Sequence, residues 1–374
     1  MFDPAIWAKV PFHFWSAVVF WFGCTVGSFL NVCIYRMPIG LSVVSPPSHC
    51  PNCKYSIPFS LNVPLVTWLT LRGKCANCRE PISIRYFLVE LLTGLMFLAC
   101  WLLYGGDSAA MALVLCLVMA GLITATFIDL AHFIIPDEVT IGGAVVGFIC
   151  AFLVPELLDA PELHHAPSAM KSLKASFIGI VVGGLIVEAV RQLGKLAFGK
   201  MKVALDGPTK VFFGDTGVVL PDKEMPYEDI FYRKSDAIRC HATRVELADR
   251  CYFNADIALS PLKLKIGADE FPPEQNLYME VTTDQLVLPR EAMGFGDVKF
   301  MAAIGAFLGW QATVFSLVVS SFLGAILGGV LIVLKRHERS NPIPFGPYIA
   351  AAAAIWVFAG RPIMGWFQKW IVGG

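Results

Sequence analysis

The feature that most constrains this chain is a series of apolar stretches, each long enough or nearly long enough to cross a lipid bilayer. A bilayer core requires roughly 20 mainly apolar residues per helix, because lipid offers no partner to an unpaired backbone group. We therefore expect a mainly α-helical, polytopic membrane protein with about eight transmembrane helices. The eight stretches, of which 298–310 and 348–358 are the shortest, are 12–35, 86–104, 109–128, 139–154, 175–190, 298–310, 314–334 and 348–358.

Charged side chains are concentrated in one block of the sequence. Residues 200–292 hold 12 basic and 16 acidic side chains of the 58 in the chain, so that the other 281 residues share 30. The formal net charge is zero, which leaves no overall field to attract nucleic acid, and we expect no nucleic-acid partner. Most of the chain is therefore expected in the membrane, and one block outside it.

The pattern inside the polar block favours strands. Apolar and basic residues alternate from Leu262 to Ile266, and residues 276–288 are rich in Val, Thr, Tyr and Leu between prolines. Period-two alternation bounded by Gly and Pro is typical of short strands. We expect an inserted β-rich soluble domain at 196–292, which would act as a lid or dock an unknown protein without performing chemistry.

Basic residues in the short loops predict the orientation in the membrane, since cytoplasmic loops carry an excess of Lys and Arg. With eight spans, this rule also puts residues 129–138, the polar block and residues 294–299 at the cytoplasmic face. The basic residues lie between the first two stretches and after the seventh: Arg36, Lys54, Arg72, Lys74, Arg79, Arg85, Lys335, Arg336 and Arg339.

Four of the 11 cysteines form two Cys-x-x-Cys pairs, Cys50 with Cys53 and Cys75 with Cys78. Two such pairs at this spacing can supply four thiolates to a tetrahedral zinc ion. The alternatives are two disulfide-bonded or redox-active pairs, or a site in which His49 replaces one thiolate. A loop in the reducing cytoplasm favours zinc, and a closed four-thiolate site has a structural role.

Two aspartates lie where apolar helices end or begin. Asp129 closes the third stretch, and Asp297 opens the sixth in the sequence Gly294-Phe295-Gly296-Asp297-Val298-Lys299. Two carboxylates at the same depth can share a proton and act as base and acid on a peptide bond. Gly294 and Gly296 would let a substrate strand approach the backbone. The alternatives are a helix cap at Asp297 and an ion pair of Asp129 with Lys299 or with an arginine of a loop.

Other acids in or beside the apolar stretches have simpler interpretations. Asp137 follows Pro136 and is expected to cap the fourth span, while Glu90 and Glu188 lie inside apolar stretches. Ionisable residues within a membrane are functional candidates by default. A proton- or cation-coupled transporter that uses Asp129, Glu90 and Glu188 is therefore the alternative function, although the spans show no paired halves.

The ordered motifs resemble those of the type IV prepilin peptidases, a family of membrane aspartic proteases that often also act as N-methyltransferases. The resemblance rests on five stretches that together cover nearly all of the chain outside 195–292. They are Gly27-Ser28-Phe29-Leu30-Asn31-Val32 with Arg36, the two cysteine pairs with the segment from Ile82 to Glu90, Asp129 with Ile135-Pro136-Asp137, the segment 294–299, and Pro344-Phe345-Gly346-Pro347.

The resemblance implies that Asp129 and Asp297 cleave the basic leader of prepilins or type II secretion pseudopilins after a glycine. It places Gly294, Gly296 and Lys299 beside the substrate, and the enzyme in a bacterial inner membrane with its active site facing the cytoplasm. It also implies methylation of the new amino terminus from S-adenosylmethionine, which we expect near Glu90 and Gly94. One departure is Leu61-Asn62-Val63-Pro64, where the family usually has an acid before Asn-Ile-Pro.

The motifs divide the chain into five regions. These are a first span at 1–35, a zinc-binding, methyltransferase-associated loop at 36–85, spans two to five with the first aspartate at 86–195, the insert at 196–292, and the Gly-x-Gly-Asp motif with spans six to eight at 293–374.

Overall fold

The computed structural model describes residues 11–58, 61–159, 167–221, 224–231, 236–272, 278–289, 293–334 and 344–372. Lys335, Arg336 and Arg339, which contributed to the predicted orientation, lie outside these residues. The chain forms two compact units, one made of Met1–Glu188 with Phe295–Gly374 and the other of Ala189–Gly294.

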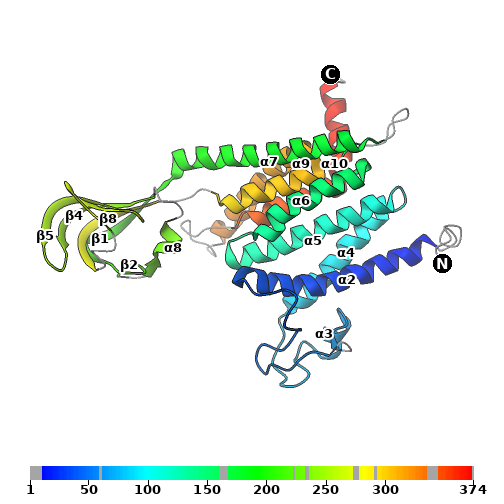
Figure 1. Cartoon of the computed structure of the whole chain (residues 1–374), viewed down its shortest axis with the longest axis horizontal. Coiled ribbons are helices and arrows are strands. Elements are labelled where there is room, and N and C mark those ends of the chain that lie inside the picture. Colours follow the sequence, from blue (N-terminus) through cyan, green and yellow to red (C-terminus); the bar gives the residue numbers. More distant parts are fainter. Residues whose placement is uncertain are drawn as a thin grey trace. The chain divides into compact units, whose positions relative to one another are not determined.

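The first unit is helical, with its elements coloured along the sequence in Figure 1. In chain order its elements are α2 (Phe12–Arg36), the 3-10 turn η1 (Met37–Ile39), α3 (Val66–Thr70), α4 (Ile84–Tyr104), α5 (Ala109–His132), α6 (Asp137–Leu153), the 3-10 turn η3 (Pro155–Leu157), α7 (Ala169–Phe198, which continues into the second unit), α9 (Phe295–Val333) and α10 (Gly346–Val372).

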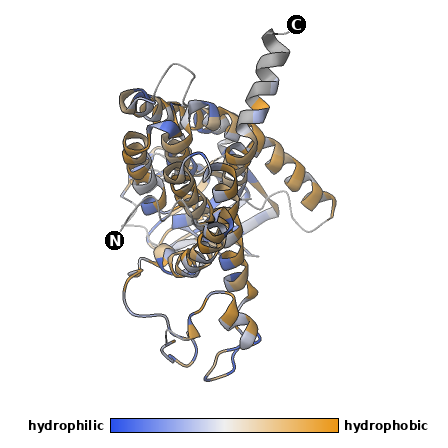
Figure 2. Cartoon of the chain, turned by 90° about the vertical axis from the view of Figure 1, so that its right-hand side faces the viewer, coloured by the Kyte–Doolittle hydropathy of each residue, from blue (hydrophilic) through white to orange (hydrophobic). Residues whose placement is uncertain are grey.

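Five helices in the described part of the chain are long and apolar enough to cross a membrane, namely α2, α4, α5, α7 and α9. Figure 2 shows that most of the helical ribbon carries the colour of hydrophobic residues. The prediction of a mainly helical, multi-pass membrane protein is thereby confirmed, but a count of eight spans is not. Helix α6 has only 17 residues, and the apolar part of α10 is also short, Gly346–Gly360.

The sixth and seventh apolar stretches lie in one helical element, α9, which is interrupted at Gly309. The backbone there has φ 79° and ψ 175°, a conformation that glycine adopts at little cost because it lacks a Cβ. Loss of helical geometry at this position separates the two stretches, although the residues on both sides continue as helix.

Helix α5 is the most enclosed of the candidate spans. Of its most apolar 18-residue segment, 72% is buried, against 44% or less of the corresponding segment in each of the other four helices. It packs against α2, α4, α6 and α10. A helix that is apolar on all sides is stable in such a position, because each face meets another helix. Asp129, in the last turn of α5, is therefore carried by a helix that is packed on several sides.

The second unit contains one eight-stranded antiparallel sheet, so the expectation of β structure in the polar block is confirmed. The strand order is β3-β2-β1-β8-β4-β5-β6-β7. Its elements are β1 (Lys200–Phe213), β2 (Gly217–Val219), β3 (Glu224–Pro226), the short helix α8 (Tyr227–Ile230), β4 (Ile238–Glu246), β5 (Cys251–Leu259), β6 (Leu264–Ile266), β7 (Asp269–Phe271) and β8 (Met279–Pro289).

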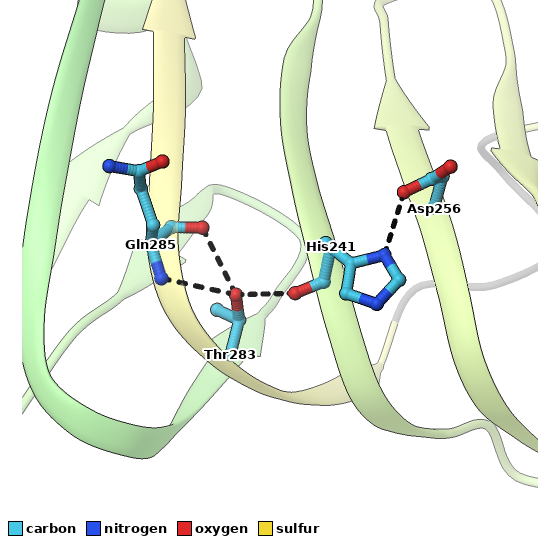
Figure 3. A network of polar contacts seen from close by, with 4 residues as sticks. All are labelled: His241, Asp256, Thr283 and Gln285. Atoms are coloured by element: carbon cyan, nitrogen blue, oxygen red, sulfur yellow. Dashed lines mark hydrogen bonds and ion pairs between the residues drawn. The ribbon is translucent and has the colours of Figure 1, made fainter.

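One face of this sheet forms a core of its own, which includes Val211, Ile257 and Leu286. Thr283 on β8 is completely buried, and its hydroxyl lies 2.8 Å from the carbonyl oxygen of His241 and 3.0 Å from that of Gln285 (Figure 3). The hydroxyl can donate to one of them at a time, and it bridges β8 and β4 between two paired sections of their ladder. On the exposed side, His241 Nδ1 lies 2.8 Å from Asp256 Oδ1.

Candidate active site

Asp129 lies in the last turn of α5 and is 5% exposed. Its Oδ2 accepts a hydrogen bond of 2.9 Å from the backbone N–H of Gly346, the first residue of α10. A Cβ on Gly346 would lie 2.6 Å from this oxygen, so only glycine fits the contact. The carboxylate is therefore fixed to a helix more than 200 residues away in the sequence.

Asp297 is the third residue of α9 and is 7% exposed. The adjacent Gly296 faces Ile135, since a Cβ on Gly296 would lie 3.6 Å from the Ile135 Cβ. Ile135 also borders Gly346, where a Cβ would lie 3.1 Å from Ile135 Cδ1. One isoleucine side chain thus separates the segment that carries Asp297 from the residue that holds Asp129. The structure brings the two aspartate segments to the same place in the first unit.

Lys299 forms an ion pair with Asp137, and its ammonium lies 5.4 Å from the centre of the Phe295 ring. The alternative pairing of Lys299 with Asp129 is not observed. Asp137 is the first residue of α6 and makes no side-chain capping bond, because the cap position is occupied by Pro136. The expectation that Asp137 caps this helix is wrong, since its carboxylate is directed to a neighbouring helix instead.

The two glycines before Asp297 differ in environment. Gly294 is exposed and lies immediately before α9, whereas Gly296 is half-buried in the first turn of that helix. Neither has a backbone conformation that requires glycine, so any need for glycine at Gly296 comes from the space beside Ile135.

Glu90 lies inside α4 and is 9% exposed. Its Oε2 accepts a hydrogen bond of 2.7 Å from the backbone N–H of Leu65, in the loop that carries the cysteines. Leu65 has φ 60° and ψ −49°, a left-handed conformation that is unfavourable for a branched side chain. A buried carboxylate therefore holds a strained turn of the loop against the span.

Gly94, one turn further along α4, lies at the closest approach of α2 and α4. A Cβ at this position would lie 2.5 Å from Cys24 Sγ and 3.0 Å from the ring of Phe20. Gly27 of α2 is equally restricted by the backbone of Glu90. The immediate role of Gly94 is to permit close packing of two helices.

The four cysteines are brought together. The sulfur atoms of Cys50, Cys53, Cys75 and Cys78 all lie within 4.8 Å of one another, at 3.8 Å for Cys50–Cys78 and 3.9 Å for Cys53–Cys75. Tetrahedral coordination with Zn–S bonds of about 2.3 Å places sulfur atoms about 3.8 Å apart, so the arrangement fits one metal ion. It does not fit two disulfides, because all four residues are free thiols.

Each cysteine pair is followed by the same backbone turn, with Lys54 and Arg79 both in the left-handed region. The amide of Asn52 donates to Cys78 Sγ at 3.8 Å, and the amide of Asn77 donates to Cys53 Sγ at 3.6 Å. Hydrogen bonds from Asn77 and from the backbone of Tyr55 lower the pKa of Cys53 to about 6, since they stabilise the thiolate that a metal requires.

The geometry does not support His49 as a metal ligand in place of one thiolate. His49 Nδ1 lies 3.0 Å from the carbonyl oxygen of Pro47, and the ring is outside the cysteine cluster. The donor set in the described residues is therefore four sulfurs.

Sequence reasoning did not assign roles to three groups that the structure places at these sites. They are the amide of Gly346, the side chain of Ile135 and the two asparagines that cross between the cysteine pairs. The repeated Asn before the second cysteine of each pair was a usable signal. The contacts of Gly346 and Ile135 depend on how distant helices pack, which no local pattern reveals.

Comparisons with known proteins place the sequence among peptidase families. Residues 21–104 match the bacterial peptidase A24 N-terminal domain, and residues 116–205 and 277–329 match the type IV leader peptidase family. Together the two matches cover more than half of the chain and leave out 206–276, most of the sheet. No solved structure matches the chain significantly.

Several curated proteins are similar over nearly the whole length. The prepilin leader peptidase/N-methyltransferase of Aeromonas hydrophila is 29% identical over 96% of this chain and 95% of the relative. The protein of that name from Stutzerimonas stutzeri is 27% identical over 91% of this chain and 89% of the relative. That from Myxococcus xanthus is more similar but over a shorter part, with 38% identity over 51% of this chain and 53% of the relative. These relatives give no support to a transporter. The membrane helices, the buried aspartates and the matched domains lead to one conclusion, that the chain belongs to the type IV leader peptidase family of membrane peptidases.

Proposed function

We propose that this protein is a membrane-embedded aspartic endopeptidase that removes the basic leader of prepilins or type II secretion pseudopilins after a glycine. The observation that carries the proposal is the convergence of the segments of Asp129 and Asp297 on Ile135, in a chain whose relatives bear this name. Both carboxylates are almost fully buried, which suits a site that excludes bulk water.

In the proposed reaction, the ionised carboxylate of the pair takes a proton from a water molecule, and the water oxygen attacks the carbonyl carbon of the glycine. The protonated carboxyl donates its proton to the carbonyl oxygen. The C–N bond then breaks as the first carboxyl gives the proton it took from water to the leaving nitrogen, and the second carboxylate takes back the proton of one hydroxyl of the intermediate, which restores the carbonyl. Gly294 and Gly296 admit an extended substrate, and Lys299 positions the start of α9 through its pair with Asp137.

We further propose eight spans in a bacterial inner membrane, with α9 crossing twice because of its break at Gly309. The basic loop at 36–85 then lies in the cytoplasm, together with Asp129, Asp297 and the sheet. This orientation suits a substrate whose basic leader remains on the cytoplasmic side.

The four cysteines are proposed to hold zinc, which would cross-link the loop between α2 and α4. Four thiolates leave no open coordination position, so the metal is structural. Asn52 and Asn77 support the thiolates from outside the coordination sphere.

Methylation of the new amino terminus is proposed from the names of the relatives, with S-adenosylmethionine supplying the methyl group. Glu90 and Gly94 take part by holding the loop and the two spans together, since Glu90 binds Leu65 and Gly94 lies against Cys24. Both residues thus act on the packing of the loop and the two spans.

The experiment uses the full chain purified in detergent and a peptide with a basic leader, a glycine and an apolar segment. Mass spectrometry should detect a cut after the glycine, and with S-adenosylmethionine the new amino terminus should gain the mass of one methyl group. A protein that retains its metal but leaves the peptide intact would contradict the peptidase proposal. Cleavage without added mass would contradict the methylation alone.

A further inference from the structure

The start of α10 lies against the carboxylate of Asp129. Gly346 is the first residue of a 27-residue helix, and its backbone N–H is one of the first-turn donors that have no partner within the helix itself. That donor is satisfied by Asp129 Oδ2 at 2.9 Å. An aspartate of α5 therefore serves as the acceptor for the amino-terminal end of another span.

The two carboxylate oxygens of Asp129 differ in their hydrogen bonding. Oδ2 is engaged by Gly346, whereas Oδ1 has no hydrogen-bond partner in the described part of the chain. A carboxylate held through one oxygen by a backbone amide cannot rotate freely, and the other oxygen keeps a defined direction.

We propose that Gly346 is a positioning residue of the peptidase, whose backbone N–H fixes the Asp129 carboxylate so that Oδ1 faces the reacting water. This inference rests on the proposed function, because it assumes that Asp129 acts as a catalytic group. The motif Pro344-Phe345-Gly346-Pro347 thereby acquires a specific role at the catalytic centre.

Two features explain why glycine occupies this position. A Cβ there would lie 2.6 Å from Asp129 Oδ2 and 3.1 Å from Ile135 Cδ1. Real Cβ atoms do not approach a carboxylate oxygen so closely, so an alanine would displace either the carboxylate or the start of α10. Both displacements lengthen the hydrogen bond.

The amide also couples two segments of the site. Ile135 borders both Gly346 and Gly296, the residue before Asp297. A shift of the α10 start is therefore transmitted to the neighbourhood of both aspartates. This differs from the role of Lys299, whose partner Asp137 is 60% exposed.

The test compares Gly346→Ala with Gly121→Ala in the full chain. Gly121 lies on α5, as does Asp129, and a Cβ there meets nothing within 4 Å, so it controls for a methyl group added to a membrane helix. Gly346→Ala should lower kcat about tenfold or more while KM stays within about twofold, because the carboxylate and not the substrate is displaced. Its pH–rate profile should move by about half a unit or more, while Gly121→Ala keeps the parental profile.

Ile135→Val provides the second arm, since it removes Cδ1 and leaves the Asp129 contact unchanged. If the damage comes from misplacing Asp129, Gly346→Ala with Ile135→Val should remain as slow as Gly346→Ala alone. Recovery of kcat and pH profile in the double variant would show that the added methyl acts through packing on Ile135, and would overturn the inference.

The outcomes separate this inference from the function on which it rests. Cleavage by the parent and loss of cleavage in Asp129→Asn support the proposed function. With those two results in hand, parental kcat and an unchanged pH profile in Gly346→Ala would overturn the positioning role alone. A parent that does not cleave would overturn both.

Discussion

The ammonium of Lys299 pairs with the carboxylate of Asp137, which ties the second turn of α9 to the first turn of α6. The Lys299 side chain is 26% exposed and that of Asp137 is 60% exposed, so solvent screens the pair. Helix α9 carries Asp297 two residues before Lys299. The pair is therefore a tether near the site rather than a part of its chemistry.

This arrangement predicts small and coupled effects. Asp137→Asn and Lys299→Met should each lower the cleavage rate by less than about fivefold, because exposed ion pairs contribute about 1 kcal/mol or less. The double variant should be no slower than either single variant, since both changes remove one interaction. Initial cleavage rates of the four proteins measure this. A Lys299→Met protein much slower than Asp137→Asn would instead indicate that Lys299 contacts substrate.

Glu90 provides a second prediction, because its carboxylate holds the N–H of Leu65. Glu90→Ala leaves that buried N–H without an acceptor. This should lower the stability of the folded loop by about 2 kcal/mol and release the loop from α4. We expect the variant to cleave the peptide but to methylate it poorly. Glu90→Gln keeps an amide oxygen that can accept the bond and should retain most of both activities.

The measurement for Glu90 is the mass of the peptide product, with limited proteolysis between residues 50 and 80 as a report on the loop. Equal loss of methylation in Glu90→Gln and Glu90→Ala would contradict the tether, since only a need for the charge itself explains that result.

The cysteine cluster predicts one zinc per chain. The double variant Cys53→Ser, Cys75→Ser should lose the metal and loosen the loop, because metal binding and local folding are coupled. Cys251→Ser is the matched control, as this exposed thiol lies on β5 of the other unit. Elemental analysis of the purified protein measures the number of zinc ions per chain. Full zinc content in the double variant would rule out the four-thiolate site.

The pairing at the base of the sheet indicates that residues 200–289 can be replaced without disrupting the membrane helices. Lys200 and Pro289 are directly paired on β1 and β8, so a short flexible linker can join these positions without separating the flanking chain. The family match also omits 206–276. The shortened protein should still cleave peptide, at a rate that reflects altered access to the site. Complete loss of cleavage in a shortened protein that binds zinc would show that the sheet takes part in the reaction.

Much of this architecture follows from the sequence, because the signals are local. A run of apolar residues specifies a membrane helix, and alternation with proline specifies strands such as β6 and β8. The cysteine site was predictable for the same reason, since two Cys-x-x-Cys pairs carry the ligand geometry in their spacing. An interruption between the apolar stretches 298–310 and 314–334 was also expected, but its position at Gly309 was not, because a single glycine in an apolar helix is usually tolerated.

The contacts that organise the candidate site could not be predicted, because they join residues that are far apart in the chain. Asp137 has the local pattern of a helix cap, yet its carboxylate forms an ion pair with Lys299 of a different helix. Glu90 has the pattern of an isolated acid in a membrane, yet a loop amide satisfies it. In both cases the tertiary partner lies outside the sequence window on which the expectation rested.

The central claim is that Asp129 and Asp297 perform the cleavage as a pair. Its most direct test is the initial rate of peptide cleavage in detergent for the parent, Asp129→Asn, Asp297→Asn and the double variant, at matched folding and zinc content. Asparagine keeps the shape but cannot move the proton, so each single change should lower the rate at least about a hundredfold, and the double change should cost little more. The parental pH–rate profile should show two apparent pKa values that belong to the pair. A folded Asp129→Asn or Asp297→Asn protein that cleaves at near the parental rate would contradict the account.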